Sequence, residues 1–434
     1  MQLDRRTALG AALGLTVAGA APARTLAQTQ APPPPPAPPA AAPAPPSLVE
    51  RINAAALQNR QKLIFDGGHF SGPAWDTLVE TGRASQFFLI GEEHGIAENP
   101  KLAAQLFASL RPAGYEHVCV EISPPMAGEL DRAAHGGVDG IRAMFADRRA
   151  NVAFFGMREE AEWIAAARAA APARGQAIWG IDYEVGADRH LIQMLKAKRK
   201  PAAAEAALAA LEAASNASWA QYGATHNPQF IFSFAGDPAL VAAVRSAWPH
   251  ADAGAAWMLE TLEETLSINR LWVSNQGWAS NQRRAEFNRR NIRRFRAGSP
   301  NSKIMFKMGA SHMVRGLTHT QVFDIGNEIS EAAEAMNAKS FHMMVLPGAG
   351  TQVAQFDPSA FTYRPSNSET YADEGMTPLM NAAYPDAFTL IDLRPIRPLV
   401  FGARHKALDA DLVRCVHGFD SLLVMSGSSA SANL

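Results

Sequence analysis

Residues 87–95 read FFLIGEEHG, a short apolar run that ends in a glycine-bounded acid and histidine. An apolar run of this length, bounded by glycine, is typical of a buried strand, and the residues after it are typical of a strand-to-helix turn. Glu92 and His94 therefore stand where a strand of a sheet is expected to end. A carboxylate and an imidazole at such a place can activate water or hold a metal ion.

Further apolar runs alternate with helical patterning along the chain. One helix is predicted where Leu102, Leu106, Phe107 and Leu110 share a face, and another through Glu159–Ala170. The predicted strands are Gln86–Ile90, Val118–Ile122, Ala177–Ile181, Lys303–Met308 and Ser340–Leu346, with weaker candidates at Phe388–Ile391 and Leu422–Met425. This alternation predicts an α/β fold with a mostly parallel central sheet flanked by helices.

The stretch at about 188–297 contains no convincing strand. It is rich in alanine, leucine, tryptophan and arginine and indicates several helices. We interpret it as a helical insertion that caps the edge of the sheet formed by the carboxyl ends of the strands. Residues 47–434 are expected to form a single α/β domain that contains this insertion.

The first 46 residues indicate targeting rather than a folded core. Arg5 and Arg6 precede a mild apolar stretch, and small residues near Ala27 would suit cleavage, so 1–27 is predicted to be a twin-arginine signal peptide. Residues 28–46 are rich in proline and alanine and are predicted to be a linker. We therefore expect a periplasmic or secreted protein.

Charge and hydropathy limit the partners. The net charge of −1 gives no long-range attraction for nucleic acid, and no stretch after the signal supplies the ~20 apolar residues of a membrane span. A small-molecule substrate is the expected partner. The oligomeric state does not follow from the sequence.

Polar residues follow several of the predicted strands at the same relative position. In open parallel sheets, ligands bind outside the carboxyl ends of the strands. Burying such side chains costs several kcal/mol unless they have partners, so a shared site is favoured over unrelated surface charges. The residues that this rule selects are Glu92, His94, Glu121, Asp182, Tyr183 and His312.

A helix predicted near 285–296 offers a polar face to the same site. Arg284, Asn288 and Asn291 recur at the spacing of one helix face. Arg284 and Asn288 join Asp182 and Tyr183 as candidate substrate-binding residues. The arginines on the neighbouring face are better explained as a solvated surface than as an anion site.

Two chemistries are open to these residues. A neutral imidazole with a pKa near ~6.5 can take a proton from water, while a carboxylate fixes its tautomer and a second histidine serves the leaving group. Alternatively, His94, Glu121 and His312 could ligate zinc, manganese or iron. No serine lies in a Gly-x-Ser-x-Gly elbow, so covalent serine catalysis is disfavoured. We place metal-free hydrolysis first.

The ordered motifs resemble the erythromycin esterase family and its wider superfamily, which includes Tiki-type proteases and ChaN-type haem-binding lipoproteins. The resemblance runs from FLIGEEHG through GYEHVCVEIS, REEAEWIAAAR, AIWGIDYE, RRAEFNRRNIRRF and KMGASHMVRG to IDLRPIRP, and covers roughly residues 85–395. It implies an esterase-like α/β fold. It also implies that His94 is the general base and His312 the second histidine of the site.

The resemblance gives roles to three more residues. It makes Glu92 and Glu121 the carboxylates that orient and stabilise His94, and Arg284 the arginine of the R-x6-N segment that ends at Asn291. The esterases usually have two residues between the glutamate and the histidine, whereas this chain has only Glu93 there. That spacing resembles the haem-uptake branch. The resulting hypotheses are an exported hydrolase of unknown substrate or, alternatively, an exported haem- or metal-ion-binding protein without turnover.

Overall fold

The fold of this chain is described from a computed structural model that covers residues 45–150, 152–173, 175–367 and 374–434. Pro46–Leu434 forms one compact unit. The predicted signal peptide and nearly all of the predicted linker lie outside the described residues. Within the described residues, no helix is long and apolar enough to cross a membrane.

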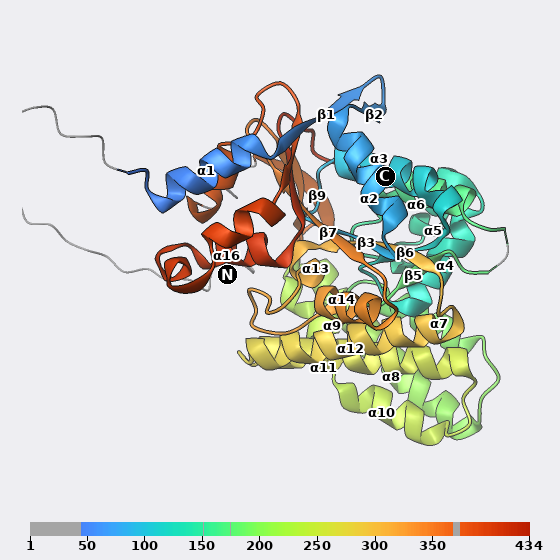
Figure 1. The fold of residues 1–434 in the computed structure, drawn as a ribbon. Helices are drawn as coiled ribbons and strands as arrows, with labels where there is room; N and C mark the ends of the chain where they lie inside the picture. Colours follow the sequence, from blue (N-terminus) through green and yellow to red (C-terminus); the bar gives the residue numbers. More distant parts are fainter. Residues whose placement is uncertain (1–44, 151, 174, 368–373) are drawn as a thin grey trace, which may run out of the picture. The chain divides into compact units, whose positions relative to one another are not determined.

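A mixed sheet forms the centre of the fold (Figure 1), with the strand order β2-β1-β10-β11-β7-β3-β6-β4-β5. The six strands from β11 to β5 pair in parallel, and β2, β1, β10 and β11 pair in antiparallel fashion. These strands are β1 (Arg60–Asp66), β2 (His69–Ser71), β3 (Phe87–Glu92), β4 (Tyr115–Val120), β5 (Ile178–Gly180), β6 (Lys303–Gly309), β7 (Ser340–Pro347), β10 (Phe388–Asp392) and β11 (Ser421–Met425). The separate hairpin consists of β8 (Gln352–Asp357) and β9 (Thr362–Asn367).

Strand β3 lies inside the sheet and is buried along its whole length. Because side chains alternate along a strand, Phe88 and Ile90 pack into one apolar cluster, whereas Phe87 and Leu89 pack into the other. Helices cover both faces, and this is why the strand reads as a continuous apolar run. The helices outside the insertion are α1 (Leu48–Gln58), α2 (Pro73–Ala84), α3 (Glu98–Leu110), α4 (Pro124–Ala134), α5 (Gly137–Ala146), α6 (Arg158–Ala170), α13 (Ala310–Met313), α14 (Ile325–Ala335), α15 (Thr377–Met380) and α16 (Ala410–Gly418).

The predicted α/β class with a mostly parallel sheet is confirmed. The insertion is helical, and its last helix reaches the carboxyl end of β5, where Asn291 Nδ2 donates to the Ile181 carbonyl at 2.9 Å. Its helices are α7 (Asp188–Lys196), α8 (Ala202–Thr225), α9 (Phe232–Ala235), α10 (Pro238–Ala247), α11 (Ala253–Val273) and α12 (Gly277–Gly298). Figure 1 shows α11 and α12 running alongside each other below the sheet.

Candidate functional site

Four neighbouring parallel strands bring the predicted residues to one edge of the sheet. The order β3-β6-β4-β5 places the carboxyl ends of these strands next to one another. Glu92 is the last residue of β3, Glu121 directly follows β4, and Asp182 lies two residues beyond β5. Strand β6 ends at Gly309 and continues into α13, which carries His312.

His94 lies between two carboxylates. Its Nδ1 is 3.0 Å from Glu92 Oε1 and its Nε2 is 3.4 Å from Glu121 Oε2. Its side chain keeps 27% exposure, whereas both glutamates are buried. The ring of Phe154 stacks on the imidazole with 3.9 Å between centroids. His94 is therefore held in place and still open to a small molecule.

Glu121 connects the rest of the site. It accepts hydrogen bonds from the Gly309 amide and from Arg284 Nη2, both at 2.7 Å. His312 Nε2 lies 3.4 Å from Glu121 Oε1, and His312 Nδ1 lies 2.7 Å from Asp324 Oδ2. Asp324 also accepts a hydrogen bond from the first amide of α14 at 2.8 Å, so this helix start fixes the ring of His312.

Both histidines are protonated at neutral pH in this arrangement. Burial acts to lower the pKa of His94, but hydrogen bonds and charges from Glu121 and Glu92 outweigh it and raise the pKa to about 10. Burial and Arg284 act to lower the pKa of His312, yet the charges of Glu121 and Asp324 raise it to about 10 as well. A neutral imidazole at a pKa near 6.5 was expected for His94. That expectation is wrong for the resting site because carboxylates flank both of its ring nitrogens.

Arg284 of α12 bridges two strand ends. Its Nε donates to Asp182 Oδ1 at 2.9 Å and its Nη2 pairs with both Asp182 and Glu121. Its guanidinium lies over the Tyr183 ring, 4.7 Å from the centroid. The Asn288 amide, oriented to suit its neighbours, donates to Asp182 Oδ1 at 3.1 Å. Asn288 is fully buried, so it lies behind Asp182 and supports it.

The structure thus brings all eight predicted site residues into one connected cluster. Glu92, His94, Glu121 and His312 form a continuous chain of contacts. Asp182, Tyr183 and Asn288 join that chain through Arg284. The contacts fix their positions, while their catalytic and substrate-binding roles remain predictions.

Comparisons with known proteins identify the fold. No family model and no curated protein matches the sequence. Among solved structures, a mutant of the erythromycin esterase EreC in its open conformation has a TM-score of 0.58 at 15% identity, covering 86% of this chain and 99% of its own. The fold is erythromycin esterase-like. At such low identity, the similarity establishes the fold and not the reaction.

Two further structures share the erythromycin esterase-like fold. A succinoglycan biosynthesis protein has a TM-score of 0.58 and a Bacillus cereus protein one of 0.56, each at 12% identity, covering 90% of this chain and 100% of their own. These similarities show the fold that the motif resemblance implies. A haem-binding ChaN structure from Campylobacter jejuni aligns with a TM-score of only 0.27, so it supports no inference about haem.

A second set of buried charges lies behind Glu92 in this erythromycin esterase-like fold, and the sequence reasoning missed it. Lys307 of β6 donates to Glu92 Oε1 at 2.7 Å and to Glu160 Oε1 at 2.5 Å, and Asn99 also donates to Glu92. Burial raises the pKa of Glu160 to about 7. A signal was present, because a lysine inside the apolar run KIMFKM requires buried carboxylate partners.

Three of the site residues have the donor set of a metal centre. Ligand atoms of Glu121, Asp182 and His312 lie within 4.8 Å of one another. The sequence-based alternative named His94 in place of Asp182. In the described residues, Arg284 already forms ion pairs with both Glu121 and Asp182, so a metal ion would have to compete with it.

Proposed function

We propose that this chain is a hydrolase that activates water at His94 to cleave an ester or related bond of a small molecule. The observation that carries the proposal is the placement of His94 between Glu92 and Glu121, with part of the ring exposed. Gly309 lacks a side chain beside His94 Nε2 and Glu121 Oε2, which lie 3.4 Å apart. We place the attacking water beside this pair of atoms, on the part of the His94 ring that stays exposed.

Each polar group has a role in this hypothesis. Glu92 holds Nδ1 of His94, so that Nε2, on the side of Glu121, removes a proton from the water beside it. His312, held by Asp324, is protonated at neutral pH. It can therefore donate a hydrogen bond to the developing oxyanion or a proton to the leaving group. Arg284 pairs with both Glu121 and Asp182 and offsets part of their negative charge. Base catalysis requires His94 to lose its Nε2 proton, so activity should rise with pH toward about 10.

The fold comparison supports the reaction class. EreC is an erythromycin esterase, and 99% of its chain aligns with 86% of this one. The single residue between Glu92 and His94 differs from the esterase spacing. We therefore propose the cleavage of an ester or related bond and no particular substrate.

A panel of small chromogenic esters tests the proposal. His94→Ala should lower kcat/KM by about 10²- to 10⁴-fold, the usual contribution of general acid–base catalysis, with the circular dichroism spectrum unchanged. His69→Ala, at an exposed histidine of β2, is the matched control and should keep full activity. Hydrolysis that survives both His94→Ala and Glu121→Ala would exclude this site as its source.

The pH profile separates two roles for His94. If it is the base, kcat/KM rises with pH toward about 10 and falls again when His312 loses its proton. If His94 acts as a proton donor instead, activity is flat at neutral pH and only falls near pH 10. The first profile supports the proposal, and the second would reverse the assignment.

A divalent metal ion is the second candidate, because Glu121, Asp182 and His312 converge. Elemental analysis and titration with Zn²⁺ or Mn²⁺ test it, with Asp182→Asn as the variant that removes one ligand and leaves His94 in place. Stoichiometric metal lost in this variant would favour binding. The haem alternative remains a prediction that a Soret band in protein from its native host would support.

Export by the twin-arginine route remains part of the proposal. Replacement of Arg5 and Arg6 by lysine should retain the full-length precursor in the cytoplasm. Cell fractionation with an antibody to the folded domain measures this. Unchanged export of the double variant would exclude the twin-arginine route.

A further inference from the structure

A cavity of about 380 Å³ lies at the opposite end of the strands from the candidate site. It is bordered by Ser340, the first residue of β7, by Asp420, directly before β11, and by Ser85, shortly before β3. Helix α14 and the 3-10 helix η6 (Arg394–Leu399) complete its wall. A volume of this size suits a small molecule rather than a macromolecule.

Positive charge dominates this cavity. Among the described residues, four basic side chains line it and two acids, Glu334 and Asp420, do so. Asp392 pairs with one of the arginines at 2.8 Å and brings a third negative charge close by, which leaves an excess of one positive charge. The four cations are Arg315, Lys339, Arg394 and Arg397.

Asp420 holds two of these arginines in fixed positions. It is 8% exposed and accepts from Arg315 Nη2 at 2.6 Å and from Arg397 Nη2 at 3.1 Å. The backbone amide of His342 donates to the same carboxylate at 3.0 Å. Two guanidinium groups thus share one carboxylate, so neither loses much flexibility when a further anion binds.

Both arginines keep donors available. Arg315 makes its bonds to Ser340 and Asp420 through Nη2, so its Nε and Nη1 make no hydrogen bond to the described residues. Arg397 uses Nε and Nη2 for Val416, Phe419 and Asp420, and its Nη1 is likewise available. Guanidinium donors in a fixed fork match the oxygens of phosphate and carboxylate groups.

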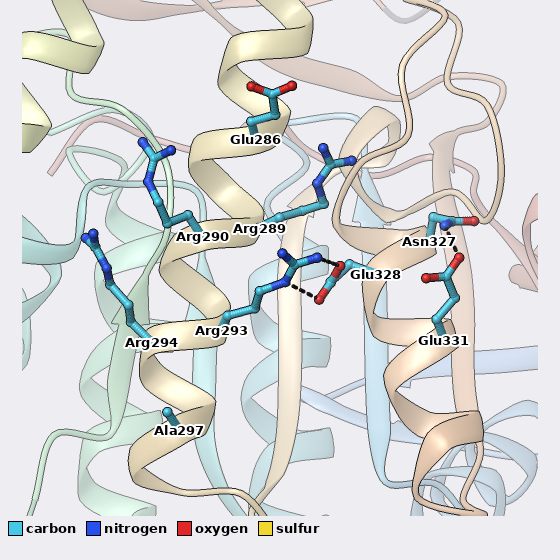
Figure 2. A pocket seen from close by; sticks show the side chains of 9 residues that line it. All are labelled: Glu286, Arg289, Arg290, Arg293, Arg294, Ala297, Asn327, Glu328 and Glu331. Carbon is cyan, nitrogen blue, oxygen red and sulfur yellow. Dashed lines mark hydrogen bonds and ion pairs between the residues drawn. The ribbon is translucent and has the colours of Figure 1, made fainter.

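A second hollow lined by arginines differs from this cavity in its charge balance. The groove of about 730 Å³ between α12 and α14 is lined by four arginines, but also by Glu286, Glu328 and Glu331 (Figure 2). Arg293 forms a two-bond pair with Glu328, and Arg290 and Arg294 pair with acids of α11. Its charges are balanced internally, so it makes no comparable anion site.

We propose that the cavity beside η6 and α14 binds a small anionic ligand that carries phosphate or carboxylate groups. The Arg315–Asp420–Arg397 cluster, in which Asp420 is buried and both arginines are partly exposed, provides the fixed donors. Lys339 provides further charge at the rim, where its side chain is exposed, and Arg394 stands beside it in a two-bond pair with Asp392. The proposal does not depend on the hydrolytic reaction.

Isothermal titration of the folded protein with inorganic phosphate, pyrophosphate and citrate tests it. At least one of these should give saturable binding below about 10 mM, and a difference between the phosphates and citrate identifies the preferred group. Lys339→Gln and Arg394→Gln should each weaken binding by about tenfold, the loss of one charge-assisted hydrogen bond. Arg293→Gln in the balanced groove is the matched control and should leave the affinity unchanged.

Two results would overturn the proposal. One is the absence of saturable binding with all three anions at about 10 mM. The other is equal weakening by Arg293→Gln and by the two cavity variants, which would indicate nonspecific charge attraction. Because Lys339 is exposed, its substitution does not endanger folding, and a negative result with that variant still counts.

Discussion

His94 owes its raised pKa to carboxylates on both sides of its ring, and one substitution separates their effects. Glu121→Gln removes the negative charge that faces Nε2 and keeps the size of the side chain. The pKa of His94 should then fall from about 10 toward its ordinary value near 6.5. Titration of the histidine ring signals by NMR measures it. Glu129→Gln, next to His190, should leave His94 unchanged.

One result would contradict the expected fall in the pKa of His94 in Glu121→Gln. An unchanged titration of His94 in this variant would show that Glu92 alone sets its charge. His312 should respond as well, because its Nε2 faces the same carboxylate. A joint shift of both histidines would confirm that Glu121 connects them.

Gly309 is the residue whose missing side chain keeps the site open. A Cβ there would stand 3.1 Å from His94 Nε2 and 3.2 Å from Glu121 Oε2, while the backbone at φ −53° and ψ 142° accepts alanine. Gly309→Ala should therefore lower ester hydrolysis by about tenfold or more and change the melting temperature little. Gly128→Ala in α4, where the nearest atom is 3.9 Å away, is the matched control. Equal activity of both variants would contradict the proposed position of the attacking water.

The residues at the strand ends could be predicted from the sequence because one rule, ligands at the carboxyl ends of parallel strands, selects them. Asp324 and Phe154 could not. Asp324 acts through the start of α14, twelve residues after His312, and Phe154 stacks on His94 from a loop where its backbone has a φ of 66°. No local pattern encodes such contacts. The raised pKa values also depend on distances between strands, which spacing along the chain does not give.

At the scale of elements, Lys307 ties β6 to both β3 and α6. Lys307→Met would leave Glu92 and Glu160 buried without their shared cation. Removing one partner of a buried pair costs about 3–5 kcal/mol, so unfolding in urea should show a loss of that size. Lys303→Met, at the partly exposed start of the same strand, should cost less than about 1 kcal/mol. A small loss at Lys307 would mean that Glu160 takes up a proton and relieves the buried charge.

The parallel strands were predictable because each is buried on both faces and reads as an apolar run. The antiparallel elements β1, β2, β8 and β9 were missed. In β1, which reads RQKLIFD, only Leu63 is buried, so the strand lacks an apolar run. The predicted strand Val118–Ile122 is shifted from the observed Tyr115–Val120, which places Glu121 just outside the strand, where its carboxylate can turn toward Arg284.

At the scale of the whole molecule, buried ionisable groups make stability depend on pH in three ways. Burial raises the pKa of Glu160 and Glu184 to about 7, so their contribution is present below their ordinary pKa of 4.5 and is lost as pH rises to about 7. The raised pKa values of His94 and His312 stabilise the fold below 6.5, and this stability is lost as pH rises through about 10. The lowered pKa of Glu121 acts oppositely, and its contribution is lost as pH falls below 4.5.

The raised pKa values predict a decline in stability from about neutral pH toward pH 10, whereas the buried His342, whose pKa is lowered to about 3, costs stability as pH falls below 6.5. The melting temperature should therefore be higher at pH 6 than at pH 9. Between pH 7 and 10 each histidine contributes a slope of up to about 1.4 kcal/mol per pH unit, since one pKa unit corresponds to that energy. The double variant His94→Gln, His312→Gln should flatten this decline in stability above pH 7. The loss of stability below pH 7 should remain, because it comes from the buried glutamates. A melting temperature that is equal at pH 6 and 9 in the unchanged protein would show that the histidines are not held as imidazolium ions, and the site would then rest with His94 neutral and ready to act as a base.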